Sequence, residues 1–184
     1  MIIYVDTGVF FDYLIYRSLT GARMRGASRR GRARSRLSKD ATSCFSEIQK
    51  KSHKGITSTL TLFELEHAVF EDLQASTKGV SYKDKYIIPS ARATVLQGFA
   101  TIQTYGIVLL DLTPTVITRM LEESHLQISG IHAADSLHVV TAILNNAELI
   151  ITTDTDLRRL DGVFINSAGT KIRCVDTDVA LSLL

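Results

Sequence analysis

Tryptophan is absent from this chain of 184 residues, and only two prolines and two cysteines occur. Because proline interrupts helices, its scarcity allows long helices to form. Cys44 and Cys174 are too few to build a disulfide framework, which excludes the small disulfide-bonded secreted domains and favours reduced thiols in a reducing compartment. Hydrophobic residues make up 45% of the chain and charged residues 22%, which excludes a disordered or fibrous protein and predicts a folded one with a sizeable core.

Long apolar runs are also missing. No stretch reaches the roughly 18 apolar residues that a membrane-spanning helix needs. The apolar N-terminus, MIIYVDTGVFFDYLIY, has no basic residue ahead of it. It also carries Asp6 and Asp12, which are costly inside a membrane. We therefore expect a cytoplasmic protein without a signal peptide and without a membrane partner.

Several catalytic motifs are absent as well. The chain has no P-loop and no glycine-rich dinucleotide fingerprint, and Ser136 does not lie in a G-x-S-x-G elbow. A phosphatase with an aspartyl nucleophile is expected to show a D-x-D after its first strand, where this chain has Asp6, Thr7 and Gly8. These absences disfavour nucleotide-binding enzymes, serine hydrolases and aspartyl phosphatases.

Acidic residues are missing between Arg17 and Arg36, where eight arginines lie. Removing these eight leaves 13 basic residues against 19 acidic ones, so the rest of the chain carries about −6. We interpret residues 20–38, rich in Gly, Ala and Ser, as a basic insertion or mobile loop. Arginine neutralises phosphate charge, which favours RNA binding over a role in solubility or docking to an acidic partner. The candidate RNA-binding residues are Arg23, Arg25, Arg29, Arg30, Arg32, Arg34 and Arg36.

Short apolar runs alternate with amphipathic stretches, which indicates strands alternating with helices. We predict strands at Met1–Val5, Gly55–Ser58, Gly106–Leu110, Ala147–Ile151 and Lys171–Val175. We predict helices at Thr7–Leu19, Lys39–Lys51, Thr59–Ser76, within Tyr82–Tyr105, at Pro114–Ser124, at Ala133–Asn145, shortly after Asp154, and at Asp178–Leu184. Strands that are continuous apolar runs are typical of a buried parallel sheet, so the expected fold class is α/β, with a short parallel β-sheet covered on both faces.

Four acidic residues stand out by their positions. Asp6 and Asp154 follow predicted strands, where parallel α/β sheets place their active sites. Glu64 and Asp135 lie in the first turns of two predicted helices, among apolar residues. An unpaired carboxylate in such surroundings is costly, so each of these two needs a partner, a metal or a water-filled cleft.

Carboxylates gathered at one edge of a sheet repel one another unless a cation lies between them. Mg²⁺ or Mn²⁺ fits, because hard cations prefer oxygen ligands and retain positions for water and phosphate. Taken singly, Asp6 and Asp154 are equally well explained as helix caps, and Glu64 and Asp135 as partners of a buried cation. Taken together, the four favour a metal-dependent catalytic site.

A transition-metal site is the alternative, because His132, Asp135 and His138 are spaced to share one side of a helix. Zinc sites usually need a third strong nitrogen or sulfur ligand, and none is evident. We therefore interpret His138 as a packing residue and His132 as a turn residue.

Four segments carry a family resemblance: IIYVDTGVFFDYL, ITSTLTLFELEHAV, IHAADSLHVVTAI and AELIITTDTDL. In this order they resemble the motifs of PIN-domain nucleases, in particular the toxin-like VapC branch, and they span most of the chain. The resemblance implies a three-layer α/β/α sandwich, a single domain over residues 1–184, and cleavage of RNA with Mg²⁺ or Mn²⁺. The basic insertion and the region 76–104 are both long for the family.

The resemblance also implies roles for individual residues. The family's acidic cluster falls on Asp6, Glu64, Asp135 and Asp154, with Asp156 as an auxiliary acid and Thr7, Thr152 or Thr153 as polar neighbours. Three of these acids would ligate metal, namely Asp6, Asp135 and Asp154. Glu64 would ligate a metal or orient the attacking water.

The leading hypothesis is a ribonuclease toxin of a toxin–antitoxin pair. It implies a small antitoxin whose Arg or Lys reaches the carboxylates, and a homodimer. A second hypothesis is a non-catalytic RNA-binding or assembly module, which the intact acids disfavour. A third is a PIN nuclease of RNA processing that has no antitoxin.

Overall fold

The computed structural model describes residues 1–15, 28–29, 31–77, 81 and 84–184. Over these residues, the main sheet has five parallel strands in the order β5-β4-β1-β6-β7. They are β1 (Ile2–Val5), β4 (Lys54–Ser58), β5 (Val108–Leu110), β6 (Leu149–Ile151) and β7 (Arg173–Val175). A short antiparallel pair joins β2 (Ser28–Arg29) to β3 (Arg32–Ala33). The parallel sheet predicted from the apolar runs is confirmed.

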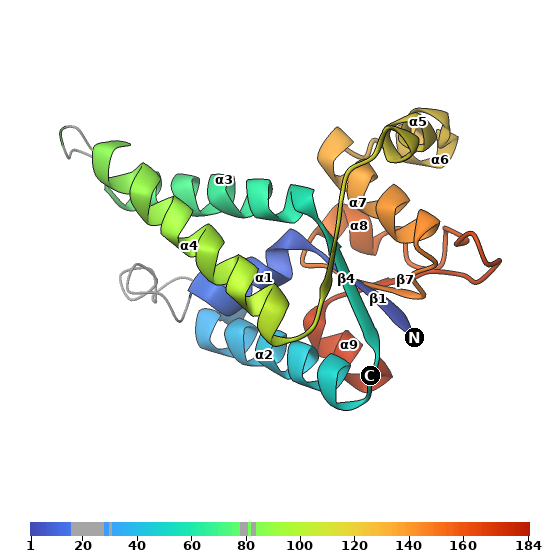
Figure 1. The fold of residues 1–184 in the computed structure, drawn as a ribbon, viewed down its shortest axis with the longest axis horizontal. Helices are drawn as coiled ribbons and strands as arrows, with labels where there is room; N and C mark the ends of the chain where they lie inside the picture. The colour runs from blue at the N-terminus through green and yellow to red at the C-terminus, as the bar shows by residue number, and fades with distance from the viewer. Residues whose placement is uncertain (16–27, 30, 78–80, 82–83) are drawn as a thin grey trace.

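Helices lie on both faces of the main sheet (Figure 1). They are α1 (Thr7–Ile15), α2 (Arg34–Lys50), α3 (Thr59–Ser76), α4 (Asp84–Thr104), α5 (Pro114–Glu122), α6 (Ser124–Ile128), α7 (Ala133–Leu144), α8 (Thr155–Arg158) and α9 (Thr177–Leu183). The region that is long for the family is mainly α4. It packs along α3, and the two helices extend together beyond the sheet (Figure 1).

The central strand β1 shows how the three layers form. Ile3 and Val5 belong to an apolar cluster with residues of α1, α2 and α3, whereas Tyr4 belongs to a second cluster with residues of α5 and α7. All three side chains are fully buried. Because successive side chains of a strand point to opposite faces, this division places one core on each face of the sheet. The α/β/α sandwich is confirmed.

Helix α2 corrects the interpretation of residues 20–38 as a loop, for residues 34–38. The helix was expected at Lys39 but begins at Arg34, and Leu37 within its first turns is only 1% exposed. The arginine charges are compensated here, because Arg32 and Arg36 both form ion pairs with Asp40. A basic stretch with buried ion-pair partners can therefore form a packed helix.

Two further elements differ from expectation. The strand predicted at Gly106–Leu110 was expected to be buried, but β5 lies at the edge of the sheet, and Val108 is 41% exposed. Helix α6, which follows α5 after a break at Glu123, was not predicted. The predicted continuation of α1 beyond Ile15, to Leu19, lies outside the described residues.

Both cysteines are buried and form no disulfide. Burial raises the pKa of the Cys44 and Cys174 thiols to about 12, so both remain protonated at neutral pH. Among the helices in the described part of the chain, none has the length and apolar character required to cross a membrane.

Candidate active site

The four acids singled out by the sequence meet in one cleft. Asp6 directly follows β1, and Asp154 follows β6 after two threonines. Glu64 lies near the start of α3, and Asp135 lies in the first turn of α7. All four line a cleft of about 750 Å³. For Asp6, Glu64 and Asp154 the cause is the topology: β1, β4 and β6 are adjacent and parallel, so the segments that follow them begin at the same end of the sheet. Asp135 comes from the start of α7, the helix that precedes β6.

Asp6 is only 5% exposed. Its Oδ2 accepts a hydrogen bond of 2.7 Å from the Oγ1 of Thr152. Burial raises the pKa of Asp6, and the nearby charge of Glu64 adds to this effect, while His138 and the bond from Thr152 oppose it; the pKa is raised overall. The ionised form of Asp6 would therefore be stabilised by a cation placed beside it.

Glu64 is held by two donors. The hydroxyl of Thr7 donates to its Oε2 at 2.5 Å, and Nε2 of His138 lies 2.6 Å from the same oxygen. Burial alone would raise the pKa of Glu64, but the hydrogen bond and charge of His138 and the bond from Thr7 outweigh burial and lower it. Glu64 is therefore an ionised carboxylate near neutral pH.

Asp135 experiences the repulsion expected of a carboxylate cluster. Its pKa is raised to about 6, first by burial and then by the charges of Asp154, Asp6 and Glu64 in that order, while the charge of His138 opposes them. Three neighbouring acids thus act on one half-buried carboxyl. This excess of negative charge is the physical basis for placing a cation in the cleft.

Asp154 combines two features that the sequence had presented as alternatives. Its Oδ1 caps α8 by accepting hydrogen bonds from the backbone N–H groups of Asp156 (2.7 Å) and Leu157 (2.9 Å). Its side chain also lines the cleft. Capping fixes the carboxylate, and Oδ2 takes no part in these two bonds. The auxiliary acid Asp156 is exposed, forms an ion pair with Arg159 at 3.0 Å and is not among the residues that line the cleft.

The model of the PIN domain family matches residues 3–163, a range that contains all four acids. The chain belongs to the PIN domain family. PIN domains are generally nucleases that use divalent metals. The acidic cleft described above therefore lies on a nuclease-type fold and supports hydrolase chemistry. No curated protein matches the chain.

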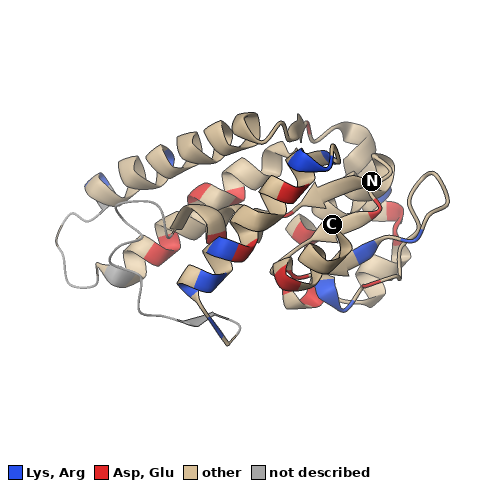
Figure 2. Ribbon diagram, turned by 90° about the horizontal axis from the view of Figure 1, so that it is seen from below, with Lys and Arg blue, Asp and Glu red and all other residues tan. Residues whose placement is uncertain are grey.

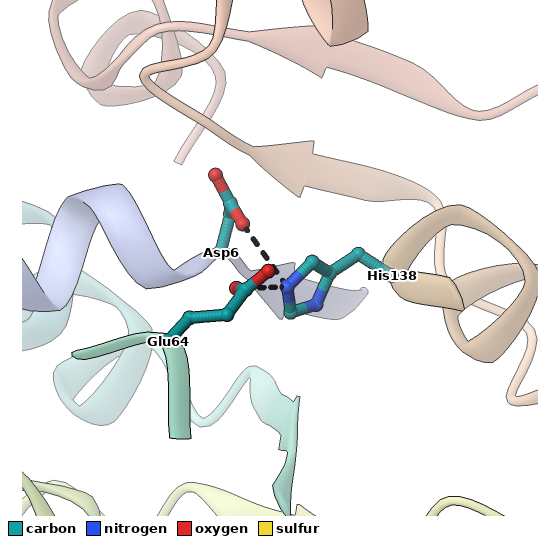
Figure 3. A group of neighbouring side chains, drawn as sticks. All are labelled: Asp6, Glu64 and His138. Carbon is teal, nitrogen blue, oxygen red and sulfur yellow. Dashed lines mark hydrogen bonds and ion pairs between the residues drawn. The ribbon is translucent and has the colours of Figure 1, made fainter. Parts of the chain in front are cut away.

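His138 is the residue of this PIN domain that sequence reasoning misjudged. It was interpreted as a packing residue, and it is indeed fully buried. Its Nε2 nevertheless lies 2.6 Å from Glu64 and 3.7 Å from Asp6, and both carboxylates point toward the imidazole (Figure 3). Burial lowers the pKa of His138, but the bond to Glu64 and the charges of Asp6, Glu64 and Asp135 raise it overall. The available signal was its position one helical turn after Asp135.

The residues of the alternative transition-metal site, His132, Asp135 and His138, do not come together. His132 precedes α7 and is exposed, and it is absent from the cleft lining. Over the described part of the chain, the His, Cys, Asp and Glu side chains close enough to share one ion are Asp6, Glu64 and His138, with ligand atoms within 4.8 Å of one another. Asp135 and Asp154 line the same cleft but do not belong to this group.

The arginines predicted to bind RNA have different surroundings. Arg23, Arg25 and Arg30 lie outside the described residues, as does the side chain of Arg29. The guanidinium of Arg32 is paired with Asp40, Asp176 and Asp178 at 2.7–3.4 Å, and Arg36 is paired with Asp40. Over the described elements, basic positions are interspersed with acidic ones (Figure 2). Arg34 pairs with Asp72 at 3.2 Å and also lines the acidic cleft.

The cleft fits a hard divalent cation. Its four carboxylates supply oxygen donors, which Mg²⁺ and Mn²⁺ prefer. Burial and neighbouring carboxylates raise the pKa values of Asp6 and Asp135, so a cation beside them would stabilise their ionised forms. Thr7 and Thr152 orient two of the carboxylates by hydrogen bonding, and Thr153 contributes to the wall of the cleft. The donor set is therefore compatible with the metal that the family uses.

Proposed function

We propose that this PIN domain is a Mg²⁺- or Mn²⁺-dependent endoribonuclease and the toxin of a toxin–antitoxin pair, similar to the VapC branch. One observation carries the proposal: four carboxylates from four separate elements line a single cleft, and their mutual repulsion contributes to a pKa of about 6 at Asp135. A module that only binds RNA gains nothing from gathering negative charge, because RNA is itself negatively charged. A hydrolase that needs a bound cation does gain from it, because the gathered carboxylates hold the cation.

The proposed roles follow from these contacts. Asp6, Asp135 and Asp154 would hold the metal, which supplies an activated water and stabilises charge on the phosphate when it is bound. Glu64 would contribute a ligand or orient the attacking water through its remaining oxygen, because Thr7 and His138 both bind Oε2. Attack of the water oxygen on phosphorus would break one P–O bond of the RNA backbone.

Arg34 is the best-placed of the described arginines to contact RNA. It lines the same cleft as the four acids, together with Glu71 and Asp72 of α3. Its guanidinium is paired with Asp72 at 3.2 Å. A phosphate next to the scissile one would be attracted to this cleft-lining guanidinium and would compete with Asp72 for it. The other arginines of the segment would add weaker, sequence-independent attraction.

The toxin assignment rests on the motif resemblance and carries further expectations. A small antitoxin would block the acidic cleft with an Arg or Lys, since a cation is what the carboxylates attract. We also propose that the protein is cytoplasmic and forms a homodimer. A short reading frame upstream of the gene, encoding a DNA-binding N-terminus, would support this setting over RNA processing without an antitoxin.

The test is cleavage of a mixed RNA pool with Mg²⁺, with Mn²⁺ and with chelator, using the wild type and Asp135→Asn. The matched control is Asp111→Asn. Asp111 directly follows β5, at the carboxyl end of that strand, but it is exposed and does not line the cleft. We expect cutting that requires metal, disappears in Asp135→Asn and is unchanged in Asp111→Asn.

A second matched pair lies on α3. Glu64→Gln removes a cleft carboxylate, whereas Glu66→Gln removes one that pairs with Arg92 at 3.3 Å outside the cleft. Only the first variant should lose activity. If the folded wild type cuts nothing with either metal but still binds RNA, the non-catalytic module becomes the better description. Equal activity in all variants would place the chemistry elsewhere.

A further inference from the structure

His138 joins three elements of the site from a fully buried position on α7. Its Nε2 is 2.6 Å from Oε2 of Glu64, which lies on α3. Its Nδ1 is 2.6 Å from the hydroxyl of Tyr4, which lies on β1 and is itself fully buried. The rings of Tyr4 and His138 meet edge to face with their centroids 5.7 Å apart. The imidazole thus bridges a buried phenol and a cleft carboxylate.

The proton on the imidazole follows from the chemistry of these neighbours. A carboxylate that binds metal is ionised, and an ionised carboxylate only accepts hydrogen bonds. A contact of 2.6 Å therefore requires a hydrogen on Nε2. The hydroxyl of Tyr4 can donate to Nδ1 or accept from it. In either arrangement Nε2 carries the proton and has no lone pair to offer a metal.

We propose that His138, backed by Tyr4, is a positioning residue that holds Glu64 for metal binding through its Nε2–H, and that it is not itself a metal ligand. This inference rests on the proposed metal-dependent function. The proximity of Asp6, Glu64 and His138, with ligand atoms within 4.8 Å, invites the opposite assignment. The hydrogen bond to Glu64 decides against that assignment.

The geometry at Glu64 shows what the positioning achieves. His138 and Thr7 both bind Oε2, and neither of these bonds uses Oε1. Figure 3 shows one carboxylate oxygen of Glu64 joined to His138 by a dashed line. The carboxylate is therefore fixed through one oxygen, while the other can take part in the cleft that Glu64 lines. Partners that orient a metal-binding carboxylate in this way typically contribute a factor of about 10–100 to metal affinity or activity.

Two amide substitutions test the roles of the two ring nitrogens of His138 separately. His138→Gln can place an N–H near the position of Nε2, facing Glu64. His138→Asn places its amide near the position of Nδ1, facing Tyr4, and cannot reach Glu64. Titration of each folded variant with Mn²⁺, followed by electron paramagnetic resonance, measures metal affinity without any RNA. We expect His138→Asn to bind Mn²⁺ about 10–100-fold more weakly and His138→Gln to recover most of the wild-type affinity.

The position of the proton can be measured in the wild type, which avoids dependence on a variant that fails to fold. Nitrogen-15 spectra of histidine-labelled protein distinguish a protonated from an unprotonated ring nitrogen. We expect Nε2 of His138 to remain protonated without metal and with saturating Mg²⁺. Loss of that proton when Mg²⁺ is added would make His138 a ligand and overturn the proposal.

The variants offer independent ways to reject the proposal. If His138→Asn bound Mn²⁺ as tightly as the wild type, the imidazole would have no positioning role. If His138→Gln and His138→Asn lost affinity equally while both remained folded, the N–H toward Glu64 would not be the cause. Failure of the proposed nuclease function looks different: metal binding and the spectra would behave as expected, but no RNA would be cut.

Discussion

Thr152 donates a hydrogen bond of 2.7 Å to Asp6, although the two residues are 146 positions apart in the sequence. The same hydroxyl oxygen accepts a bond of 3.0 Å from the backbone N–H of Asp154. One buried threonine therefore connects the first acid of the cleft to the fourth. The connection exists because β1 and β6 are adjacent parallel strands whose carboxyl ends lie side by side.

Thr152→Val removes both bonds while nearly preserving the shape of the side chain. Asp6 then stays buried with one donor fewer, which raises its pKa further and destabilises the folded state by about 1–3 kcal/mol. Denaturant titration of the metal-free protein measures this loss. Thr152→Ser keeps the hydroxyl and should retain most of the stability. A Thr152→Val protein as stable as the wild type would show that the bond to Asp6 contributes nothing.

Gly8 allows α1 to approach the loop after β6. A Cβ at this position would lie 1.9 Å from Oγ1 of Thr153, so Gly8→Ala must displace a wall of the cleft. We expect a loss of about 1–3 kcal/mol in the free energy of unfolding, together with weaker metal binding. Thr153→Ala removes the clashing oxygen, so the double variant should recover part of both losses. A double-mutant cycle without coupling between the two positions would contradict this contact.

Asp135 makes the stability of the metal-free protein depend on pH. Its pKa is about 6 in the folded state against an ordinary value of 3.8. The folded state binds the proton of Asp135 more tightly than the unfolded state does. The contribution of this group to the free energy of unfolding is therefore greatest below about pH 4, and it is lost as the pH rises to about 6. Asp135→Asn should remove this loss and raise the melting temperature at pH 7 by about 2–4 °C. This corresponds to about 1 kcal/mol after discounting for the exposure of the group.

The control for this pH effect is Asp111→Asn, which changes charge equally at an exposed position outside the cleft. Calorimetric scans between pH 4 and pH 7 should show the wild-type slope in this variant. If Asp135→Asn kept the same slope, another group would be responsible for it.

Metal should stabilise the wild type and not Asp135→Asn. A ligand that binds only the folded state at 100 times its dissociation constant adds about 2.7 kcal/mol. Thermal unfolding with increasing Mg²⁺ measures this effect, and potassium chloride at matched ionic strength controls for screening. An equal rise in melting temperature in both proteins would mean that the cleft does not hold the ion.

Arg34 should contribute more to RNA affinity than Arg36. Both arginines are paired with an acid, Arg34 with Asp72 and Arg36 with Asp40, but only Arg34 lines the cleft. In an uncut complex prepared with Asp135→Asn, Arg34→Ala should weaken binding and lower the slope of log affinity against log salt by about 1. Fluorescence anisotropy at several salt concentrations provides this slope. Equal losses for the two arginines would indicate general attraction by the basic segment.

Local patterns in the sequence were sufficient for much of the fold. Helix α3 was predicted with its observed bounds, Thr59–Ser76, because its apolar residues recur at helical spacing. The strands β1 and β6 were recognisable as short apolar runs, and that marked Asp6 and Asp154 as residues at strand ends. Patterns of this kind depend on neighbours in the chain and can be read without the tertiary structure.

Contacts between distant segments were not predictable in this way. The interpretation of residues 20–38 as a loop was wrong at residues 34–38, which belong to α2. The acids that compensate nearby arginines come from distant segments: Asp72 on α3 pairs with Arg34, and Asp176 before α9 pairs with Arg32. The strand predicted at Gly106–Leu110 was expected to be buried, since an apolar run does not reveal which strand will lie at the edge of a sheet.

The sequence by itself therefore determined the alternation of elements, the parallel sheet and the identity of the four acids, because periodicity and strand ends are local properties. Only the tertiary structure decided which of these groups touch. It placed His138 between Tyr4 and Glu64, and it bound Thr152 to Asp6. The physical reason is that a buried polar group must find its hydrogen-bond partner, and packing alone brings that partner within reach from another part of the chain.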